Sequence, residues 1–231
     1  MKRSEINAAI LRAKKRFEEY KITLPMFAYW SVEEWNKNRE ITSQIRERML
    51  GWDVSDFGSG DFKEMGAVLF TVRNGDKNDA DNKAPYAEKY ILLDDENPQT
   101  LPFHYHIQKA EDIINRGGGV LVVEMYNKAA DGKEDRENDV TVYQDGIKHT
   151  YKPGEPIYIT PGNSITIEPY MYHRFYAQKG KGYLICGEVS KVNDDNCDNI
   201  YLYPQERFSQ IEEDEAILHP LVNEYDNIRF C

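Results

Sequence analysis

The residues best suited to chemistry lie in one short stretch, Phe103 to Gly119, which holds two of the five histidines and a nearby carboxylate. His104 and His106 are two positions apart, and in a β-strand residues i and i+2 point to the same face. Two neighbouring imidazoles and the carboxylate of Glu111 form a ligand set for a borderline divalent ion such as Mn, Fe, Co, Ni or Zn. The alternative is a strand with two ordinary surface histidines.

The spacing of these residues also predicts a bend in the chain. Glu111 has the wrong parity to share a face with His104 and His106 on an unbroken strand. The chain must therefore change direction between Ile107 and Ala110 if all three side chains are to converge.

A fourth ligand candidate, His173, follows the Pro161-Gly162 turn and the next short strand. In a closed double sheet, the segments that carry His104 and His173 can face each other across the barrel. His149 and His219 have no comparable setting, and we interpret them as ordinary residues.

The elements that must position these side chains change character along the chain. Residues 1–60 are expected to be mainly helical. The pattern predicts an amphipathic helix over 4–20 that Ser4 can cap, and a second helix that begins with a capping box at Ser31 to Glu34. A further helix is expected over 40–50, followed by a loop over 52–60. Residues 66–204 carry short apolar runs separated by Gly, Pro, Asn and Asp turns, which indicates an antiparallel sandwich or small barrel. In the C-terminal segment, 205–231, the acidic run at 206–215 is typical of a solvated helical face.

Composition excludes several classes of function. A chain of 231 residues with 40% hydrophobic residues can bury one good core, either as a single domain with additions or as two small domains. A formal charge of -11 argues against nucleic acid or an anionic membrane as the main partner. Three cysteines without a Cys-x-x-Cys pair suit a reducing compartment, and we see neither a secretory signal nor an apolar run long enough to span a bilayer. We therefore expect a cytoplasmic protein.

The candidate ligands match the two sequence motifs of the cupin family. His104, His106, Glu111 and the glycines at 117–119 resemble the first motif, His-x-His-x₄-Glu followed by Gly. Pro161-Gly162 and His173 resemble the second, although the two turn residues are adjacent and the histidine lies farther on than usual. The resemblance implies a mainly β protein, one cupin jelly-roll β-barrel domain over 1–231 with an N-terminal helical extension and additional short helices.

Three longer stretches resemble the D-lyxose ketol-isomerase family of cupin sugar isomerases. They are Pro85 to Lys89, His104 to Gly119 and Ile211 to Glu215. The resemblance implies an isomerase that uses Mn(II), or another divalent ion such as Co(II), to interconvert D-lyxose and D-xylulose, with D-mannose and D-fructose as a side reaction. It also implies a homodimer and a monosaccharide substrate.

The resemblance leads to candidates for the other roles. If the reaction passes through a cis-enediol, a base must move a proton between two carbons, and a hydride shift is the alternative route. Glu206 is the preferred base, with Glu188 next, and Lys109 is the preferred proton donor because it lies between two ligands. We expect Lys89, Lys109 and Glu206 to bind the sugar.

Two other functions fit the same ligands. Three histidines and a glutamate can hold Fe(II) in a cupin dioxygenase. A non-catalytic sugar-binding cupin would need the metal but no acid–base pair.

Overall fold

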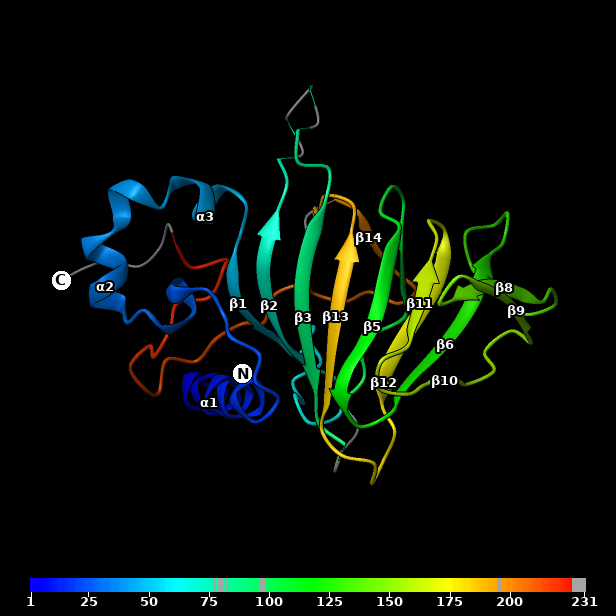
Figure 1. Ribbon diagram of the computed structural model, residues 1–231, viewed down its shortest axis with the longest axis horizontal. Helices are drawn as coiled ribbons and strands as arrows, with labels where there is room; N and C mark the ends of the chain where they lie inside the picture. Colours follow the sequence, from blue (N-terminus) through cyan, green and yellow to red (C-terminus); the bar gives the residue numbers. More distant parts are fainter. Residues whose placement is uncertain (77, 79–80, 82, 96–98, 195–196, 226–231) are drawn as a thin grey trace.

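The protein is described by a computed structural model that covers residues 1–76, 78, 81, 83–95, 99–194 and 197–225. Two antiparallel β-sheets form its centre, and helices lie at one end of the larger sheet (Figure 1). The larger sheet has eight strands in the order β1-β2-β3-β13-β5-β11-β8-β9. Their bounds are β1 Gly51–Ser55, β2 Ala67–Asn74, β3 Ala87–Leu93, β13 Leu184–Ser190, β5 Glu111–Gly118, β11 Ser164–Ile167, β8 Val140–Gln144 and β9 Ile147–Tyr151.

The smaller sheet follows the order β10-β6-β12-β4-β14, and the two-residue β7 pairs with β6 outside this path. It contains the strand with the His-x-His pair. The bounds are β10 Ile157–Ile159, β6 Leu121–Lys128, β12 Met171–Ala177, β4 His104–His106, β14 Asn199–Tyr201 and β7 Glu134–Asp135.

The main hydrophobic core lies between the two sheets. Leu69 and Ile113 contribute to it from the larger sheet, and Val123 and Phe175 from the smaller one. Because side chains alternate along a strand, each of these strands presents every second residue to the core.

The helices cover the outer face of the larger sheet near β1 and β2. In β2, Val68 and Phe70 pack with Phe17 of α1, whereas Leu69 packs into the main core. Both faces of β2 are therefore buried, which explains its continuous apolar sequence. None of the helices in the described residues has the length and hydrophobicity needed to cross a membrane. The helical elements are α1 Arg3–Glu19, the 3-10 turns η1 Met26–Tyr29 and η2 Arg39–Ile41, α2 Val32–Lys37 and α3 Ser43–Glu47.

Several expected elements differ in the structure. The stretch 52–60, expected as a loop, contains most of β1, whose residues are all buried. The helix expected over 40–50 is broken into η2 and α3. The capping box of Ser31 and Glu34 is confirmed at the start of α2.

The N-terminus of α1 contacts the acidic C-terminal run. The sequence predicts that Ser4 caps this helix and that the acidic run is a solvated helical face, and neither expectation is correct. Lys2 occupies the N-cap position of α1 and makes no side-chain cap, so Ser4 does not cap this helix. Residues 206–215 form no helix in the structure. Instead Asp214 accepts hydrogen bonds from the backbone N–H and the hydroxyl of Ser4, and Glu213 pairs with Arg3. A carboxylate from the other end of the chain thus caps α1.

Candidate active site

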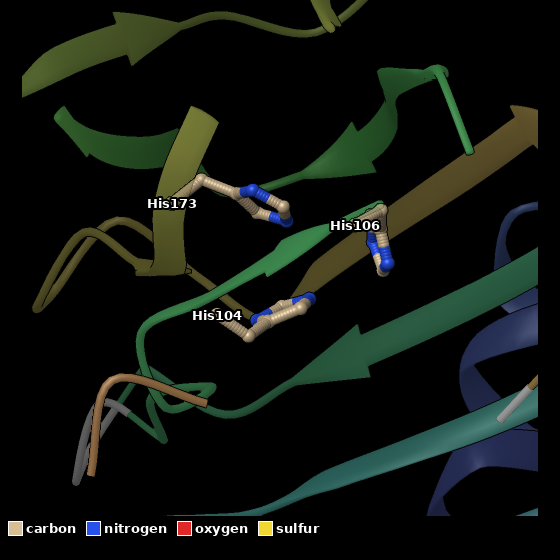
Figure 2. Close-up of side chains that lie close together, drawn as sticks. All are labelled: His104, His106 and His173. Carbon is tan, nitrogen blue, oxygen red and sulfur yellow. The ribbon is translucent and has the colours of Figure 1, made fainter. Parts of the chain in front are cut away.

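Three histidines converge inside the barrel. His104 and His106 project from the same face of β4, and His173 lies directly opposite His104 on the adjacent strand β12. One nitrogen from each ring lies within 4.8 Å of the others, and Figure 2 shows the three rings gathered in one place. The sequence-based expectation that these segments face each other across the barrel was wrong, because β4 and β12 are paired neighbours in one sheet.

Backbone carbonyls fix two of the three imidazoles. Nδ1 of His104 lies 2.9 Å from the carbonyl oxygen of Pro102, and Nδ1 of His173 lies 2.9 Å from that of Met171. A carbonyl oxygen can only accept, so each Nδ1 carries a hydrogen, and in the neutral ring Nε2 is then the nitrogen with the lone pair. Burial and the neighbouring His173 and His106 hold the pKa of His104 well below its ordinary value. The neutral ring is the form that binds a metal.

Glu111 reaches the histidines from the opposite sheet. It begins β5, and its carboxylate oxygens lie 3.2 Å from Nε2 of His173 and 3.4 Å from Nε2 of His106. Burial would raise the pKa of Glu111, but the charge of Lys109 and the proximity of His106 hold it well below its ordinary value. The bend predicted between Ile107 and Ala110 therefore carries the chain from one sheet to the other.

These residues fit a divalent metal ion. Both ring nitrogens of His106 and Nε2 of His173 are buried and have no hydrogen-bond partner in the described part of the chain. Buried polar atoms are normally satisfied, and each exception needs an explanation. Three imidazoles and one carboxylate supply the ligand atoms that such an ion requires: His104, His106, His173 and Glu111.

A second charged group adjoins the histidines. Nζ of Lys109 lies 2.7 Å from Oε2 of Glu111 and 2.9 Å from Oε1 of Glu188. Lys89 is paired with Glu188 across β3 and β13, and its Nζ donates to Oδ1 of Asn193 at 2.7 Å. All four of these lysine and glutamate residues are at most 4% exposed.

The electrostatics of this group are set by the ion pairs. Burial alone would lower the pKa of Lys109, but the charges of Glu111 and Glu188 outweigh it and raise the pKa. Burial alone would raise the pKa of Glu188, but the charges of Lys109 and Lys89 outweigh it and lower the pKa. Near neutral pH the lysine is therefore an acid that retains its proton, and Glu188 is an ionised carboxylate.

One inner cavity connects the two groups. Apolar side chains from both sheets, among them Leu69 and Phe175, form part of its wall. Its polar wall consists of Lys89, His104, His106, Lys109, Glu111, Glu188, Asn193, Asn199, Tyr201 and Arg207.

Glu206 is the sequence candidate that the structure does not bring into this cavity. Its side chain is exposed, and its carboxylate lies 3.5 Å from Nε2 of Gln210. The next residue, Arg207, lines the cavity and pairs with the buried Asp53 at 2.5 Å.

Sequence reasoning missed Asn193, Asp198 and Arg207. None of them belongs to a recognisable motif, and each lies in an irregular or short segment far from the histidines in sequence. For Glu188, the sequence did contain a signal: a carboxylate within an otherwise apolar strand indicates a buried charged residue with a specific partner.

Known proteins resemble the chain over its whole length. A family model described as D-lyxose isomerase matches residues 1–225. A D-lyxose/D-mannose isomerase of Escherichia coli O157:H7 is 40% identical over 230 residues, which cover 99% of this chain and all of that protein. A protein of the same name from Serratia proteamaculans is 41% identical and covers 97% of this chain and 98% of its own length.

The fold is also found in solved structures. The L-ribose isomerase of Geodermatophilus obscurus superposes with a TM-score of 0.61 at 13% identity, covering 92% of this chain and 98% of that one. The ligand-free L-ribose isomerase of Cellulomonas parahominis gives 0.60 at 12% identity with the same coverage. These likenesses support the mainly β cupin fold. The sequence matches show that the chain belongs to the D-lyxose isomerase family of sugar isomerases.

Proposed function

We propose that the protein interconverts D-lyxose and D-xylulose, and also D-mannose and D-fructose, with a divalent metal ion, Mn(II), held by His104, His106, Glu111 and His173. The relatives named above carry the substrate part of this proposal. The observation that carries the mechanism is the contact of Lys109 with both Glu111 and Glu188 inside one cavity. When bound, the ion supplies Lewis acidity for the carbonyl and neighbouring hydroxyl oxygens of the open-chain sugar.

In the proposed cis-enediol route, Glu188 is the base. Its ionised carboxylate takes the proton from C2 of the aldose, and the electron pair of that C–H bond forms the C1–C2 double bond. Lys109 donates its proton to the carbonyl oxygen at C1 as the C–O double bond becomes single. Lys109 then takes the hydroxyl proton at C2, and Glu188 returns its proton to C1, which gives the ketose with both residues restored.

Glu188 replaces Glu206 in this role because Glu206 is exposed outside the cavity lining. Lys89 and Asn193, which line the same cavity, are the proposed partners of the sugar hydroxyls. The dioxygenase and non-catalytic alternatives are disfavoured because the chain belongs to a family of isomerases.

The direct test is to incubate Mn(II)-loaded protein with a panel of free aldoses that includes D-lyxose and D-mannose. We expect D-xylulose to form from D-lyxose. In D₂O, the cis-enediol route incorporates deuterium at C1 of the ketose, whereas a hydride shift does not. No turnover across the panel would contradict the proposal.

We also propose that the chain acts as one cupin-type domain, in a cytoplasmic homodimer. The low cysteine content supports the compartment, and the interleaved order of the strands supports a single domain, since each sheet is built from distant parts of the chain. The sedimentation coefficient of the purified protein tests the dimer.

A further inference from the structure

The bend between β4 and β5 controls how the two halves of the site meet. β4 ends at His106 in one sheet, and β5 begins at Glu111 in the other. The connecting residues include Lys109, so the conformation of this bend sets the place of a proposed ligand and of the proposed acid together.

One buried carboxylate holds the bend. Oδ1 of Asp198 accepts hydrogen bonds from the backbone N–H groups of Ile107 at 3.0 Å and Gln108 at 2.8 Å. Oδ2 accepts one from the N–H of Lys109 at 3.1 Å. Asp198 is 8% exposed and directly precedes β14, whose first residue, Asn199, pairs with His106. A single side chain thus accepts hydrogen bonds from three consecutive backbone amides. Hydrogen bonds to a carboxylate are stronger than those between neutral groups, which makes this an effective way to fix the bend.

The same carboxylate faces the third histidine. Oδ2 of Asp198 lies 3.9 Å from Nδ1 of His106. His104 and His173 are oriented by backbone carbonyls, whereas Nδ1 of His106 has no hydrogen-bond partner in the described residues. Asp198 is therefore placed to orient the one imidazole that the backbone does not fix. Such outer partners of metal-binding histidines set ring orientation and ligand basicity.

We propose that Asp198 is a positioning residue that links metal affinity to the placement of Lys109. It touches neither the sugar nor the reacting atoms in this proposal. It acts through the backbone of 107–109 and through the ring of His106. The inference rests on the metal site of the proposed function and extends it to a residue outside the ligand set.

The test is the Mn(II) dissociation constant of the Asp198→Asn variant, measured without sugar by equilibrium dialysis and elemental analysis. The amide keeps the shape of the side chain but replaces one acceptor oxygen with a donor group, so at least one of the three backbone bonds is lost. Loss of an outer partner typically weakens metal binding about 10- to 100-fold, and we expect a change of that size. Amide hydrogen exchange at 107–109 should accelerate in the same variant.

Asp135→Asn is the matched control. Asp135 also accepts from two backbone N–H groups of a turn, those of Glu137 at 2.9 Å and Asn138 at 3.1 Å, but it lies outside the cavity lining. We expect its Mn(II) affinity to equal that of the wild type even if its melting temperature falls.

The outcomes separate the two proposals. Wild-type protein that fails to bind Mn(II) would overturn the proposed function and this inference with it. Tight binding by the wild type and equally tight binding by folded Asp198→Asn would overturn only the role of Asp198. If Asp198→Asn does not fold, the same measurements are made on Asp198→Glu, which keeps the carboxylate but lengthens the side chain. An unchanged Mn(II) dissociation constant together with unchanged amide hydrogen exchange at 107–109 in that variant would overturn the role of Asp198.

Discussion

Lys109 lies between two carboxylates and is the residue on which the charge balance of the cavity depends. Glu111 and Glu188 carry two negative charges, and Lys89 and Lys109 carry two positive charges, all in a buried setting. Removing one partner of a buried ion pair costs about 3–5 kcal/mol because the other charge is left uncompensated. Variants at these positions therefore need a stability measurement beside every rate.

The Glu188→Gln variant tests whether Glu188 is the catalytic base or only a structural partner of the two lysines. The amide keeps the size of the side chain but has no basic oxygen to accept a carbon-bound proton. General base catalysis is worth about 10²- to 10⁴-fold, so we expect the turnover number for D-lyxose to fall by that order while Mn(II) content is retained. Glu206→Gln is the control and should turn over at nearly the wild-type rate; the reverse pattern would restore Glu206 as the base.

His106→Ala tests the ligand set. Removing this imidazole leaves two histidines and one carboxylate, and we expect the purified variant to lose bound Mn(II) and activity together. His149→Ala, a change on the distant strand β9, should keep both. Chelator treatment of the wild type should abolish activity, and added Mn(II) should restore it. A His106→Ala protein with full metal occupancy by elemental analysis would remove His106 from the set.

The proposed ligands at the β4–β5 bend were predictable because their spacing is local. His104 and His106 share a face by the period of a strand, and the bend before Glu111 follows from parity. Glu206 was expected inside the cavity but lies outside its lining. Its position depends on how an irregular C-terminal segment packs, and such a segment has no repeating pattern of apolar residues from which its contacts could be predicted. Asp198 was missed for the same reason, since its partners are 89 to 91 residues away in sequence.

At the scale of elements, the first helix depends on residues that were expected to be solvated. Besides the bonds of Asp214 to Ser4, Glu215 and the carbonyl of Ala216 accept from the side-chain amide of Asn7. Arg3 is fully buried and pairs with Glu213 and Glu224. Negative groups at a helix N-terminus satisfy its free N–H groups and complement its dipole.

Asp214→Ala should therefore destabilise the protein without affecting the chemistry. Without this carboxylate the backbone N–H of Ser4 loses its side-chain acceptor, and we expect the free energy of unfolding in urea to fall. The turnover number should not change, because Asp214 is not part of the cavity lining. An unchanged denaturation midpoint would show that water replaces the carboxylate at no cost.

The order of helices and strands along the chain was largely predictable, but the contacts between distant elements were not. Short strands with turn residues between them indicate an antiparallel barrel, and the family comparison agrees. Most of strand β1 was interpreted as loop because residues 52–60 are rich in Asp, Ser and Gly, which have low strand propensity or favour turns. In the structure Asp53 is buried against Arg207, a partner from 154 residues away, and this tertiary contact outweighs the local preference.

For the whole molecule, the ion pairs predict lower stability in acid. The folded-state pKa of Glu188 is below its ordinary value of 4.5, and so is that of Glu213 beside Arg3. A carboxyl group with a lowered pKa contributes stability above its unfolded-state value, and the contribution is lost as the pH falls through the folded-state value. Buried His104 has a folded-state pKa well below its ordinary value of 6.5, so the unfolded chain gains a proton there before the folded one does, and this destabilises the fold below about pH 6.5. We therefore expect the free energy of unfolding to decline as the pH falls below about 6.5, and to decline further below about 4.5 as the carboxylates become protonated. Urea titrations across this range, repeated on Glu213→Gln, measure the effect, and a flat profile down to pH 3 would contradict it.

The pairing of Arg3 with distant carboxylates also has a consequence for biosynthesis. Glu213 and Glu224 lie 210 and 221 residues after Arg3, so they emerge from the ribosome long after the first helix. Until then α1 lacks the groups that compensate its buried guanidinium and cap its first turn. Contacts between such distant residues slow folding because a long loop must close first. The first helix to be made is therefore expected to be among the last to dock, and the nascent chain exposes its apolar face, Ile6, Ile10 and Phe17, to chaperones throughout synthesis.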